Sequence, residues 1–380
     1  MTRLKKSLCL GFLLLFWSMA ALLGCGGNSN MPMSGNQHSS KFLFVVNSDA
    51  NTVSSFTISA GSAALDMVGA PAPTGANPNY AAVSGNGKFL YVANTGISAS
   101  SVSGFKIDPA SGALTPTTPA TFNTTGGIQP LGIAVDPSST HVYTANVGSI
   151  SAFNVDSATG ALSDVPGTPV FAPAAGAILN DLKISPNGQF LYVTDGQTNT
   201  ISSYTFNGTG LPVSTGVPVG TGATPVGIVV DQGGKFVYVA NMDSNDVSAY
   251  RITAATGVLV SSGATAPVGA GCAPQELAVD PTSKFLFVSC SGAGVNAIAQ
   301  FTIDAMTGVL TPVLPAFTTG LNTTPRGLTV DASGMFVYSA LSTTNQAGTA
   351  AAAVTGVLTA TGTPAMTGAG PIGVTVSGSR

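Results

Sequence analysis

One short pattern of aromatic and β-branched residues recurs seven times along the chain. Each copy is six residues long, opens with Phe in six of the seven cases, and carries Tyr or Phe at its third position. The copies occupy residues 42–47, 89–94, 141–146, 190–195, 236–241, 285–290 and 336–341. Their starting points lie 46 to 52 residues apart. Such residues favour a strand, and such a period is typical of a solenoid or a propeller.

Each copy predicts one strand of a larger unit. A second apolar stretch that opens with Pro precedes it, as at residues 130–137 and 225–231. Another strand follows, as at 102–107, and then a tight turn of the form Thr/Ser-Gly-x-Leu, in which Gly112 allows positive φ. A fourth strand leads into the next unit. The pattern therefore predicts an all-β protein, a seven-bladed β-propeller with four antiparallel strands per blade.

The two ends of the repeat array complement each other. The Pro-led strand is missing before Phe42, and it occurs without a following copy at residues 371–377. We therefore expect the C-terminal strand to complete the first blade, which removes an open sheet edge. The seventh blade has the weakest pattern, because residues 349–354 are a poor candidate for its third strand.

The N-terminal segment has the features of an export signal. Basic residues occupy positions 3, 5 and 6, and an apolar run over residues 8–23 is short for a membrane span of roughly 20 residues. The run ends in Leu-Leu-Gly followed by Cys25, which resembles the lipoprotein signal of bacteria. The resemblance implies a signal peptide over 1–24, a lipidated Cys25 with a flexible tether over 25–40, and a propeller over 41–380. The alternative is an ordinary signal peptide with a chance cysteine.

This interpretation places the protein outside the cytoplasm, attached to the cell envelope only through its N-terminal lipid. The composition narrows the classes of partner. Charged residues make up 7% of the chain and hydrophobic residues 44%, which excludes disorder driven by charge. Outside the first six residues no basic run occurs, so nucleic-acid binding is disfavoured. We expect a monomer.

Histidine and cysteine are scarce. The chain holds two histidines, His38 in the tether and His141 inside a repeat copy, so a His-based triad or metal site is improbable. We therefore predict no metal and no cofactor. Cys272 and Cys290 fall at the start of the first strand and the end of the second strand of blade six, where a disulfide is feasible. Two free buried thiols are the alternative.

The residues of greatest interest interrupt the repeat. Carboxylates that recur at one place in the repeat, such as Asp136 and Asp231, favour a turn-capping role. The two positions after the Pro of each first strand vary instead, and several blades carry polar groups there. These residues are Asn79, Tyr80, Asn180, Asp181, Gln275, Glu276 and Arg326.

Because innermost strands all begin at one mouth of the channel, we expect these side chains to converge there as a ligand site. Glu276 is the only Glu in the chain. The alternative is a hydrated mouth without function, held by an ion pair between Arg326 and Glu276. Lys183 lies two residues beyond Asp181 and is placed to pair with it in the same way.

The strand ends at residues 105–108 and 301–304, together with the Gly turns and the repeated pattern, resemble the lactonase-type propellers. That family includes bacterial 6-phosphogluconolactonases and muconate-cyclizing enzymes, and it overlaps with propellers of surface proteins. The resemblance implies a catalytic His, an Arg-His pair and a Glu. Those positions fall on Asn180, Val226, Gly227 and Met242, so the pattern is not retained here.

Two functions remain open. The first is a binding or scaffold module, with the channel mouth as the site for a lactone, a sugar or an envelope protein. The second is a lactone hydrolase with a rearranged site, in which Glu276 or Asp181 is the base and Arg326 gives electrostatic support.

Overall fold

The computed structural model describes residues 41–96, 100–172, 174 and 176–378. The predicted signal peptide, Cys25 and the tether lie outside the described residues and stay predictions. Within the described part of the chain, no helix is long and apolar enough to cross a membrane.

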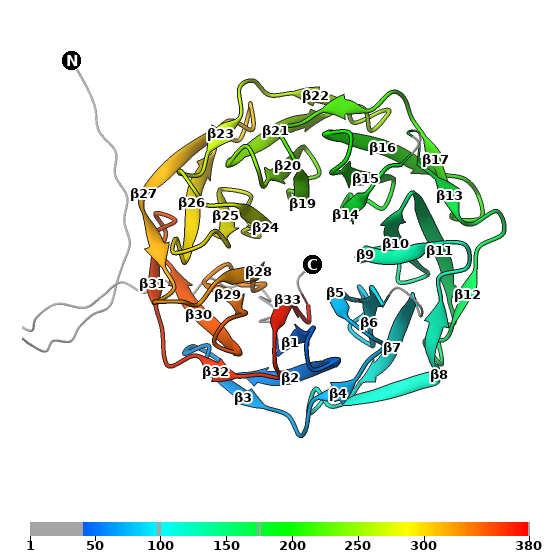
Figure 1. Cartoon of the computed structure of the whole chain (residues 1–380), viewed down its shortest axis with the longest axis horizontal. Coiled ribbons are helices and arrows are strands. Elements are labelled where there is room, and N and C mark those ends of the chain that lie inside the picture. Colours follow the sequence, from blue (N-terminus) through cyan, green and yellow to red (C-terminus); the bar gives the residue numbers. More distant parts are fainter. Residues whose placement is uncertain (1–40, 97–99, 173, 175, 379–380) are drawn as a thin grey trace, which may run out of the picture. The chain divides into compact units, whose positions relative to one another are not determined.

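Seven antiparallel sheets stand in a ring around a central channel, which confirms the predicted seven-bladed propeller (Figure 1). The innermost strand of each blade borders the channel. In blade order these strands are β33 (Pro371–Val376), β5 (Pro78–Val83), β9 (Ile128–Val135), β14 (Leu179–Ile184), β19 (Pro225–Val230), β24 (Pro274–Val279) and β28 (Pro325–Val330).

The repeated pattern forms the second strand of every blade, fully or almost fully buried. These strands are β1 (Phe42–Asn47), β6 (Phe89–Asn94), β10 (His141–Val147), β15 (Phe190–Asp195), β20 (Phe236–Asn241), β25 (Phe285–Cys290) and β29 (Phe336–Leu341). Aromatic and β-branched side chains suit a central strand that packs on both faces.

The third strands have nearly equal lengths in all blades. They are β2 (Thr52–Ile58), β7 (Ser101–Ile107), β11 (Ser149–Val155), β16 (Thr200–Phe206), β21 (Asp246–Ile252), β26 (Ala297–Ile303) and β30 (Gln346–Ala352). The weak strand expected over 349–354 was misplaced. β30 begins at Gln346 and pairs with β29 over six residues, because the neighbouring strand supplies the order that its alanines lack.

The outermost strand is broken into two short pieces in five blades and is continuous in blades two and six. The pieces are β3 (Leu65–Met67) with β4 (Ala72–Pro73), β12 (Leu162–Asp164) with β13 (Val170–Phe171), β17 (Pro212–Ser214) with β18 (Val219–Gly220), β22 (Leu259–Ser261) with β23 (Ala266–Pro267), and β31 (Leu358–Ala360) with β32 (Ala365–Met366). The continuous strands are β8 (Leu114–Asn123) and β27 (Leu310–Thr318). Short outer strands limit edge-to-edge pairing with other chains.

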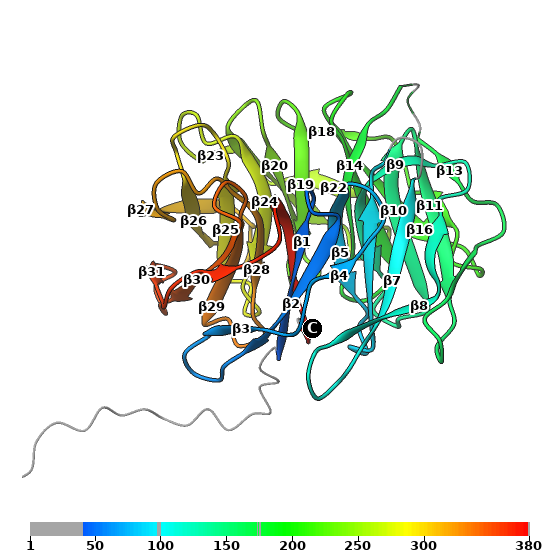
Figure 2. The ribbon, with the colours of Figure 1, turned by 60° about the horizontal axis from the view of Figure 1, so that its bottom comes forward.

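The ring closes as predicted, with the C-terminal strand in the first blade. β33 pairs antiparallel with β1, and Leu43 lies opposite Val376. Figures 1 and 2 show β33 in red beside the blue β1. A buried cluster that joins Leu43 and Phe56 to Tyr338 of blade seven seals this junction.

The recurring turn requires glycine for a second reason besides its positive φ. Gly112 has φ of 75°, and a Cβ there would meet the ring of Phe42 in the preceding blade at 2.4 Å. Gly210 packs on His141 in the same way, and Tyr143 donates a hydrogen bond to the Gly210 carbonyl at 2.8 Å. In six of the seven blades the turn therefore packs on the first aromatic residue of the repeated pattern in the preceding blade, whereas Gly61 of blade one makes no such contact.

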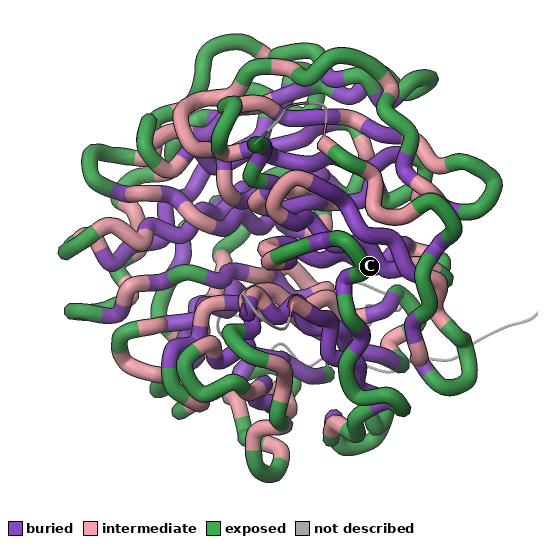
Figure 3. Tube along the Cα trace, turned by 45° about the vertical axis from the view of Figure 1, so that its right-hand side comes forward, coloured by how far each residue is buried: buried purple, intermediate pink, exposed green. Residues whose placement is uncertain are grey.

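The recurring aspartates hold turns, as their repetition predicts. One carboxylate oxygen of Asp231 accepts the backbone N–H groups of Lys235 and Phe236, both at 2.6 Å. Asp136 makes the equivalent contacts with Thr140 and His141. Figure 3 shows buried segments (purple) in the interior and exposed segments (green) mainly at the periphery. The second strands are buried, whereas the outermost strands such as β8 and β27 are largely exposed.

Candidate functional site

In five of the seven blades the two variable positions of the inner strand lie in a β-bulge, and in blades one and three the second position, Gly373 or Gly132, is paired with the neighbouring strand. In blade four, Leu179 pairs with Asp195, and the next pair is Leu182 with Val193. Two residues of β14, Asn180 and Asp181, therefore face the single residue Thr194. The inner strands of blades two, five, six and seven have the same register shift. A bulge redirects side chains and is often found beside functional sites.

The first bulge position connects neighbouring inner strands. The amide of Asn79 donates to the Leu131 carbonyl at 2.8 Å, and the amide of Asn180 donates to the Pro225 carbonyl at 2.7 Å. The amide of Gln275 lies 3.1 Å from the sulfur of Met242. These three predicted ligand-binding residues thus use their amide nitrogens within the protein.

Arg326 occupies the first bulge position of blade seven and is exposed. The ion pair expected between Arg326 and Glu276 is not formed, since the cation within 4 Å of Glu276 is Lys183. The side chain of Arg326 makes no ion pair with the described residues of this region. Its charge lowers the pKa of Tyr80 and so partly offsets the burial and acidic charges that raise it. The prediction that it converges with the acids was therefore wrong.

The second of the two variable positions is a large residue in blades two, four and six and glycine in the other four blades, so that each large residue follows a glycine in the preceding blade. A Cβ on Gly132 would lie 2.7 Å from the Cα of Asp181 in the next blade. A Cβ on Gly227 would lie 2.2 Å from the carbonyl oxygen of Gln275, just before Glu276. A Cβ on Gly373 would likewise lie 2.6 Å from the carbonyl oxygen of Asn79, just before Tyr80 in the next blade. Each large residue enters the channel because the blade before it contributes no side chain there.

Tyr80, Asp181 and Glu276 meet in the channel together with Lys183. Lys183 Nζ lies 2.7 Å from Asp181 Oδ2, which forms the predicted pair, and 3.9 Å from Glu276 Oε1. The same ammonium lies 5.9 Å from the centroid of the Tyr80 ring. Asp181 is 1% exposed and Glu276 6% exposed, so the channel is nearly closed at this level.

The hydroxyl groups of Thr194 and Ser289 bind the backbone of the two acids, a role that the sequence did not lead us to predict. Thr194 Oγ1 accepts the N–H of Asp181 at 3.1 Å and donates to the Val226 carbonyl at 3.0 Å. Ser289 Oγ accepts the N–H of Glu276 at 3.0 Å and donates to the Arg326 carbonyl at 2.6 Å.

A signal for these hydroxyls was present in the repeat. The fifth position of the pattern is apolar in five copies, and it is Thr194 or Ser289 only in the two blades that carry a buried acid. The residue opposite a bulge is the one able to reach the backbone groups that the bulge leaves without ladder partners.

Burial raises the pKa of the Glu276 carboxyl to about 8, and the charge of Asp181 acts in the same direction while Lys183 and Tyr80 oppose it. Glu276 therefore holds its proton at neutral pH. Its Oε2 atom is buried and has no hydrogen-bond partner of ordinary geometry among the described residues. Nine buried side-chain atoms of the described residues lack a partner in this sense, and Glu276 Oε2 is the one whose residue lines the cavity. At that place a ligand, a water or an ion can supply the missing partner.

In the other groups of the cluster, burial and neighbouring charges both affect the pKa, in some cases in opposite directions. Burial lowers the pKa of Lys183, but the charge of Asp181, with a smaller effect from Glu276 and the hydrogen bond to Asp181, outweighs burial and raises that pKa above its ordinary value. Burial raises the pKa of Asp181, while Lys183 and two backbone N–H groups act against it. Burial, with the charges of Glu276 and Asp181, also raises the pKa of Tyr80, so its hydroxyl remains a hydrogen-bond donor.

A cavity of about 440 Å³ begins at this cluster and runs along the channel. Tyr80, Lys183 and Glu276 line one end, and Pro186 and Gln232 line the other, beyond the ends of the inner strands. None of Asn79, Asn180, Gln275 and Arg326 lines it. The sequence predicted a site at the mouth where inner strands begin, but the cavity faces the opposite mouth.

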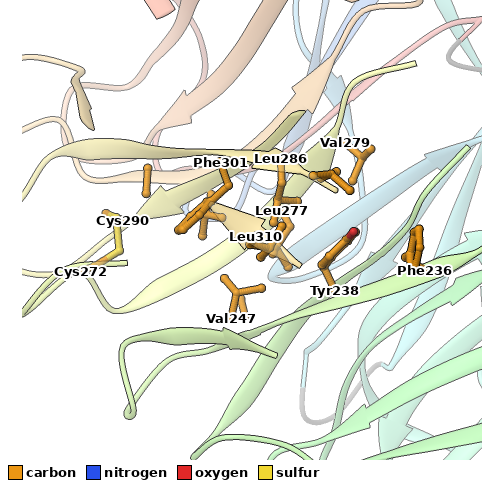
Figure 4. Close-up of a cluster of buried hydrophobic side chains, with 14 of the residues drawn as sticks. Phe236, Tyr238, Val247, Cys272, Leu277, Val279, Leu286, Cys290, Phe301 and Leu310 are labelled. Carbon is orange, nitrogen blue, oxygen red and sulfur yellow. A yellow bond between two sulfur atoms is a disulfide. The ribbon is translucent and has the colours of Figure 1, made fainter. Parts of the chain in front are cut away.

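A disulfide anchors the strand that carries Glu276. Cys272 and Cys290 are bonded, with their Cα atoms 4.5 Å apart, and both are buried. Figure 4 shows the bond beside the buried side chains of Leu277 and Val247. The bond joins the chain just before β24 to the end of β25, four residues from Glu276.

The arrangement suits binding of a polar group and proton transfer better than metal binding. The described residues contain no group of three or more His, Cys, Asp or Glu side chains placed to hold a metal. His141, the one His in the described residues, lies in the blade-three scaffold. A protonated carboxyl, an ammonium and a phenol instead converge at the closed end of a cavity, which is a common form of ligand site.

Comparison with known proteins defines the class to which this propeller belongs. The family model described as "Lactonase, 7-bladed beta-propeller" matches residues 76–179, 105–274 and 272–375. Together these matches cover the chain from residue 76 to residue 375. The chain belongs to the lactonase family of seven-bladed β-propellers.

Individual relatives are more distant. A 6-phosphogluconolactonase from Yersinia pestis is 32% identical over 81 residues, which are 21% of this chain and 24% of that protein. A 6-phosphogluconolactonase from Pectobacterium carotovorum is 28% identical over 156 residues, 40% of this chain and 46% of its own length. The chain thus matches about a quarter to a half of the length of these relatives.

Solved structures share the fold over nearly the whole propeller. The periplasmic gluconolactonase from Pseudomonas aeruginosa superposes with a TM-score of 0.75 at 19% identity. The match covers 89% of this chain and 99% of that one.

Proposed function

We propose that this protein is an exported, lipid-anchored binding module whose channel takes a small carbonyl-bearing molecule, such as a lactone or a sugar lactone. The observation that carries the proposal is Glu276 Oε2, which is buried at the end of the cavity without a hydrogen-bond partner among the described residues. A ligand carbonyl there would accept the carboxyl proton. Lys183, whose ammonium has three N–H groups, offers a further donor at the same end, whereas the Tyr80 hydroxyl interacts with the Glu276 carboxyl itself.

The export part of the proposal has separate support. The signal-like residues 1–24 and the Leu-Leu-Gly-Cys25 sequence resemble a bacterial lipoprotein. The disulfide between Cys272 and Cys290 suits an oxidising compartment outside the cytoplasm. The fold-level likeness to a periplasmic gluconolactonase agrees with that location.

Lactone hydrolysis is the second candidate, and the pKa of Glu276 favours it. A carboxyl with a pKa of about 8 is well matched to proton transfer near neutral pH. Asp181 does not line the cavity, which leaves Glu276 as the base. Ionised Glu276 would take a proton from water while the hydroxide adds to the lactone carbonyl carbon. Lys183 would face the oxyanion in place of the predicted Arg326.

The ring C–O bond would then break as the carbonyl re-forms. Glu276 would return the proton to the departing oxygen, which yields a hydroxy acid. The pattern of His, Arg and Glu that the family resemblance implied is replaced by Asn180, Val226, Gly227 and Met242, so hydrolysis would depend on this different set of residues.

One experiment separates the two candidates. The full chain, held in amphipol, is titrated calorimetrically with glucono-δ-lactone and simple lactones, and acid release is followed in a pH-stat. For binding, Glu276→Leu, which removes the donor, is compared with Asp66→Leu, the same change at an exposed position of β3. For turnover, Glu276→Gln, which keeps a donor but cannot act as a base, is compared with Asp66→Asn.

Binding that is lost in Glu276→Leu and kept in Asp66→Leu supports the module. Equal binding in both variants overturns it. Turnover above the buffer rate that disappears in Glu276→Gln establishes the hydrolase, and turnover at the buffer rate in all proteins rejects it.

A further inference from the structure

The two halves of the cavity differ in chemistry. Its closed end carries Tyr80, Lys183 and Glu276, the polar cluster described above. Its walls carry one residue per blade, two positions beyond the second bulge position. Lys183 excepted, these residues are small or apolar: Ala82, Ala134, Val229, Ala278, Thr329 and Thr375. A molecule that fills this space meets donors at one end, and along the walls it meets Ala and Val side chains together with the methyl and hydroxyl groups of Thr329 and Thr375. Asp331 and Gln232 add polar groups nearer the open mouth.

The cavity reaches solvent at the mouth where the inner strands end. Pro186 and Gln232 line it there and are both exposed. At the other end Asp181 and Glu276 are nearly inaccessible. A ligand with a polar group and an apolar tail therefore enters through this mouth with its polar group first. In the bound state the polar group lies at the closed end and the tail points toward solvent.

The charges at the closed end favour a neutral polar group. The ammonium of Lys183 is already matched by Asp181 at 2.7 Å, and Glu276 Oε1 lies 3.9 Å from it. A ligand carboxylate would place a second negative charge near the Asp181 carboxylate in a buried site, which is unfavourable. A carbonyl oxygen carries no charge and can accept from Glu276.

We infer that the channel binds an amphiphile, a neutral lactone or ester with an aliphatic tail, whose carbonyl lies at Glu276 and whose tail lies along the Ala, Val and Thr ring. This inference rests on the proposed function and specifies its ligand class. A volume of about 440 Å³ is at the smaller end of ordinary ligand pockets, which fits a tail of moderate length.

The test is a series of γ-lactones of increasing tail length, namely γ-butyrolactone, γ-octalactone and γ-dodecalactone, with glucono-δ-lactone as the tailless polar comparison. Dissociation constants are measured calorimetrically on the full chain in amphipol, with amphipol alone as the blank. Burial of each methylene is expected to tighten binding roughly fourfold until the channel is full.

Thr329→Leu narrows the channel without touching the polar end. It is matched by Thr359→Leu, the same change at an exposed position of β31 in the same blade. The first variant is expected to abolish the gain with tail length, and the second to keep it. Val229→Ala widens the channel and should extend the tail length at which affinity stops improving. Melting curves verify that each variant is folded.

The outcomes are distinct. Affinity that rises with tail length in the parent and in Thr359→Leu, but not in Thr329→Leu, supports the inference. Affinity that is independent of tail length, with glucono-δ-lactone bound in a Glu276-dependent manner, overturns the inference and leaves the proposed function standing. Binding of no lactone in a Glu276-dependent manner overturns both.

Discussion

Blades four and six differ from blades five and seven at two positions that lie opposite each other. Blades four and six have an acid at the second bulge position and a hydroxyl across from it, Asp181 with Thr194 and Glu276 with Ser289. Blades five and seven have glycine at the bulge and alanine across from it. The comparison shows that a buried acid occurs together with a hydroxyl group that binds its backbone N–H. It also shows that glycine at the same position of the preceding blade leaves room for the side chain of the acid.

The largest effect is expected from breaking the ion pair of blade four. Lys183→Met leaves Asp181 buried without its cation, and the loss of one partner of a buried pair should lower the free energy of unfolding by about 3 kcal/mol. Denaturant unfolding measures the loss. The double variant Lys183→Met with Asp181→Asn should recover much of it, and a double variant as unstable as the single one would contradict the pairing.

The alternation between glycine and large residues predicts the next effect. Gly227→Ala puts a methyl group 2.2 Å from the Gln275 carbonyl, so the blades must separate locally at a cost of about 2 kcal/mol. Gly208→Ala is the matched control, because a Cβ there meets nothing within 4 Å. Thermal unfolding compares the two. Equal stability of both variants would show that the blades adapt and that the glycine is not required.

The protonated Glu276 predicts a dependence on pH. Its pKa of about 8 in the folded protein lies above the ordinary value of 4.5, so between these values the folded state holds a proton that the unfolded chain has lost. Stability should therefore fall as pH rises through this window, by up to about 1.4 kcal/mol per pH unit.

Chemical unfolding at a series of pH values measures this slope. In Glu276→Gln the part of the slope that comes from Glu276 should vanish, while Asp66→Asn should retain it. A slope that is the same in the parent and in Glu276→Gln would mean that Glu276 is ionised at neutral pH.

The smallest effect is expected at the supporting hydroxyl. Ser289→Ala removes two hydrogen bonds and makes blade six resemble blade five at that position, at a cost of about 1 kcal/mol. The variant should also weaken binding in the channel, since the Glu276 backbone loses its support. Titration with the lactone series would show this, and unchanged affinity would limit Ser289 to a stabilising role.

The sequence predicts the frame of this molecule well and its site only in part. Seven copies of one pattern determine the blade number, the closure by residues 371–376, and the turn role of Asp231. The pair of Asp181 with Lys183 was predictable from their spacing. All of these features depend on period and alternation, which a repeat makes visible.

The direction of side chains in the bulge was not predictable. The two positions were treated as one group, whereas the structure sends Arg326 to solvent and Glu276 into the channel. A bulge departs from the alternation of strand side chains, so period alone does not assign its faces. The sequence also could not show which mouth leads to the cavity, since this depends on how seven strands fill the channel together.

Closure by β33 links folding to the order in which the chain is made. β1 is the first strand of the ring to be synthesised, and its partner β33 is the last. If the protein is secreted as proposed, every residue up to Val376 must pass the membrane before the circle can be completed. The ring therefore closes only after translocation is complete, and a prematurely terminated product would keep the pairing of β1 with β2 but expose the other edge of β1 to a protease.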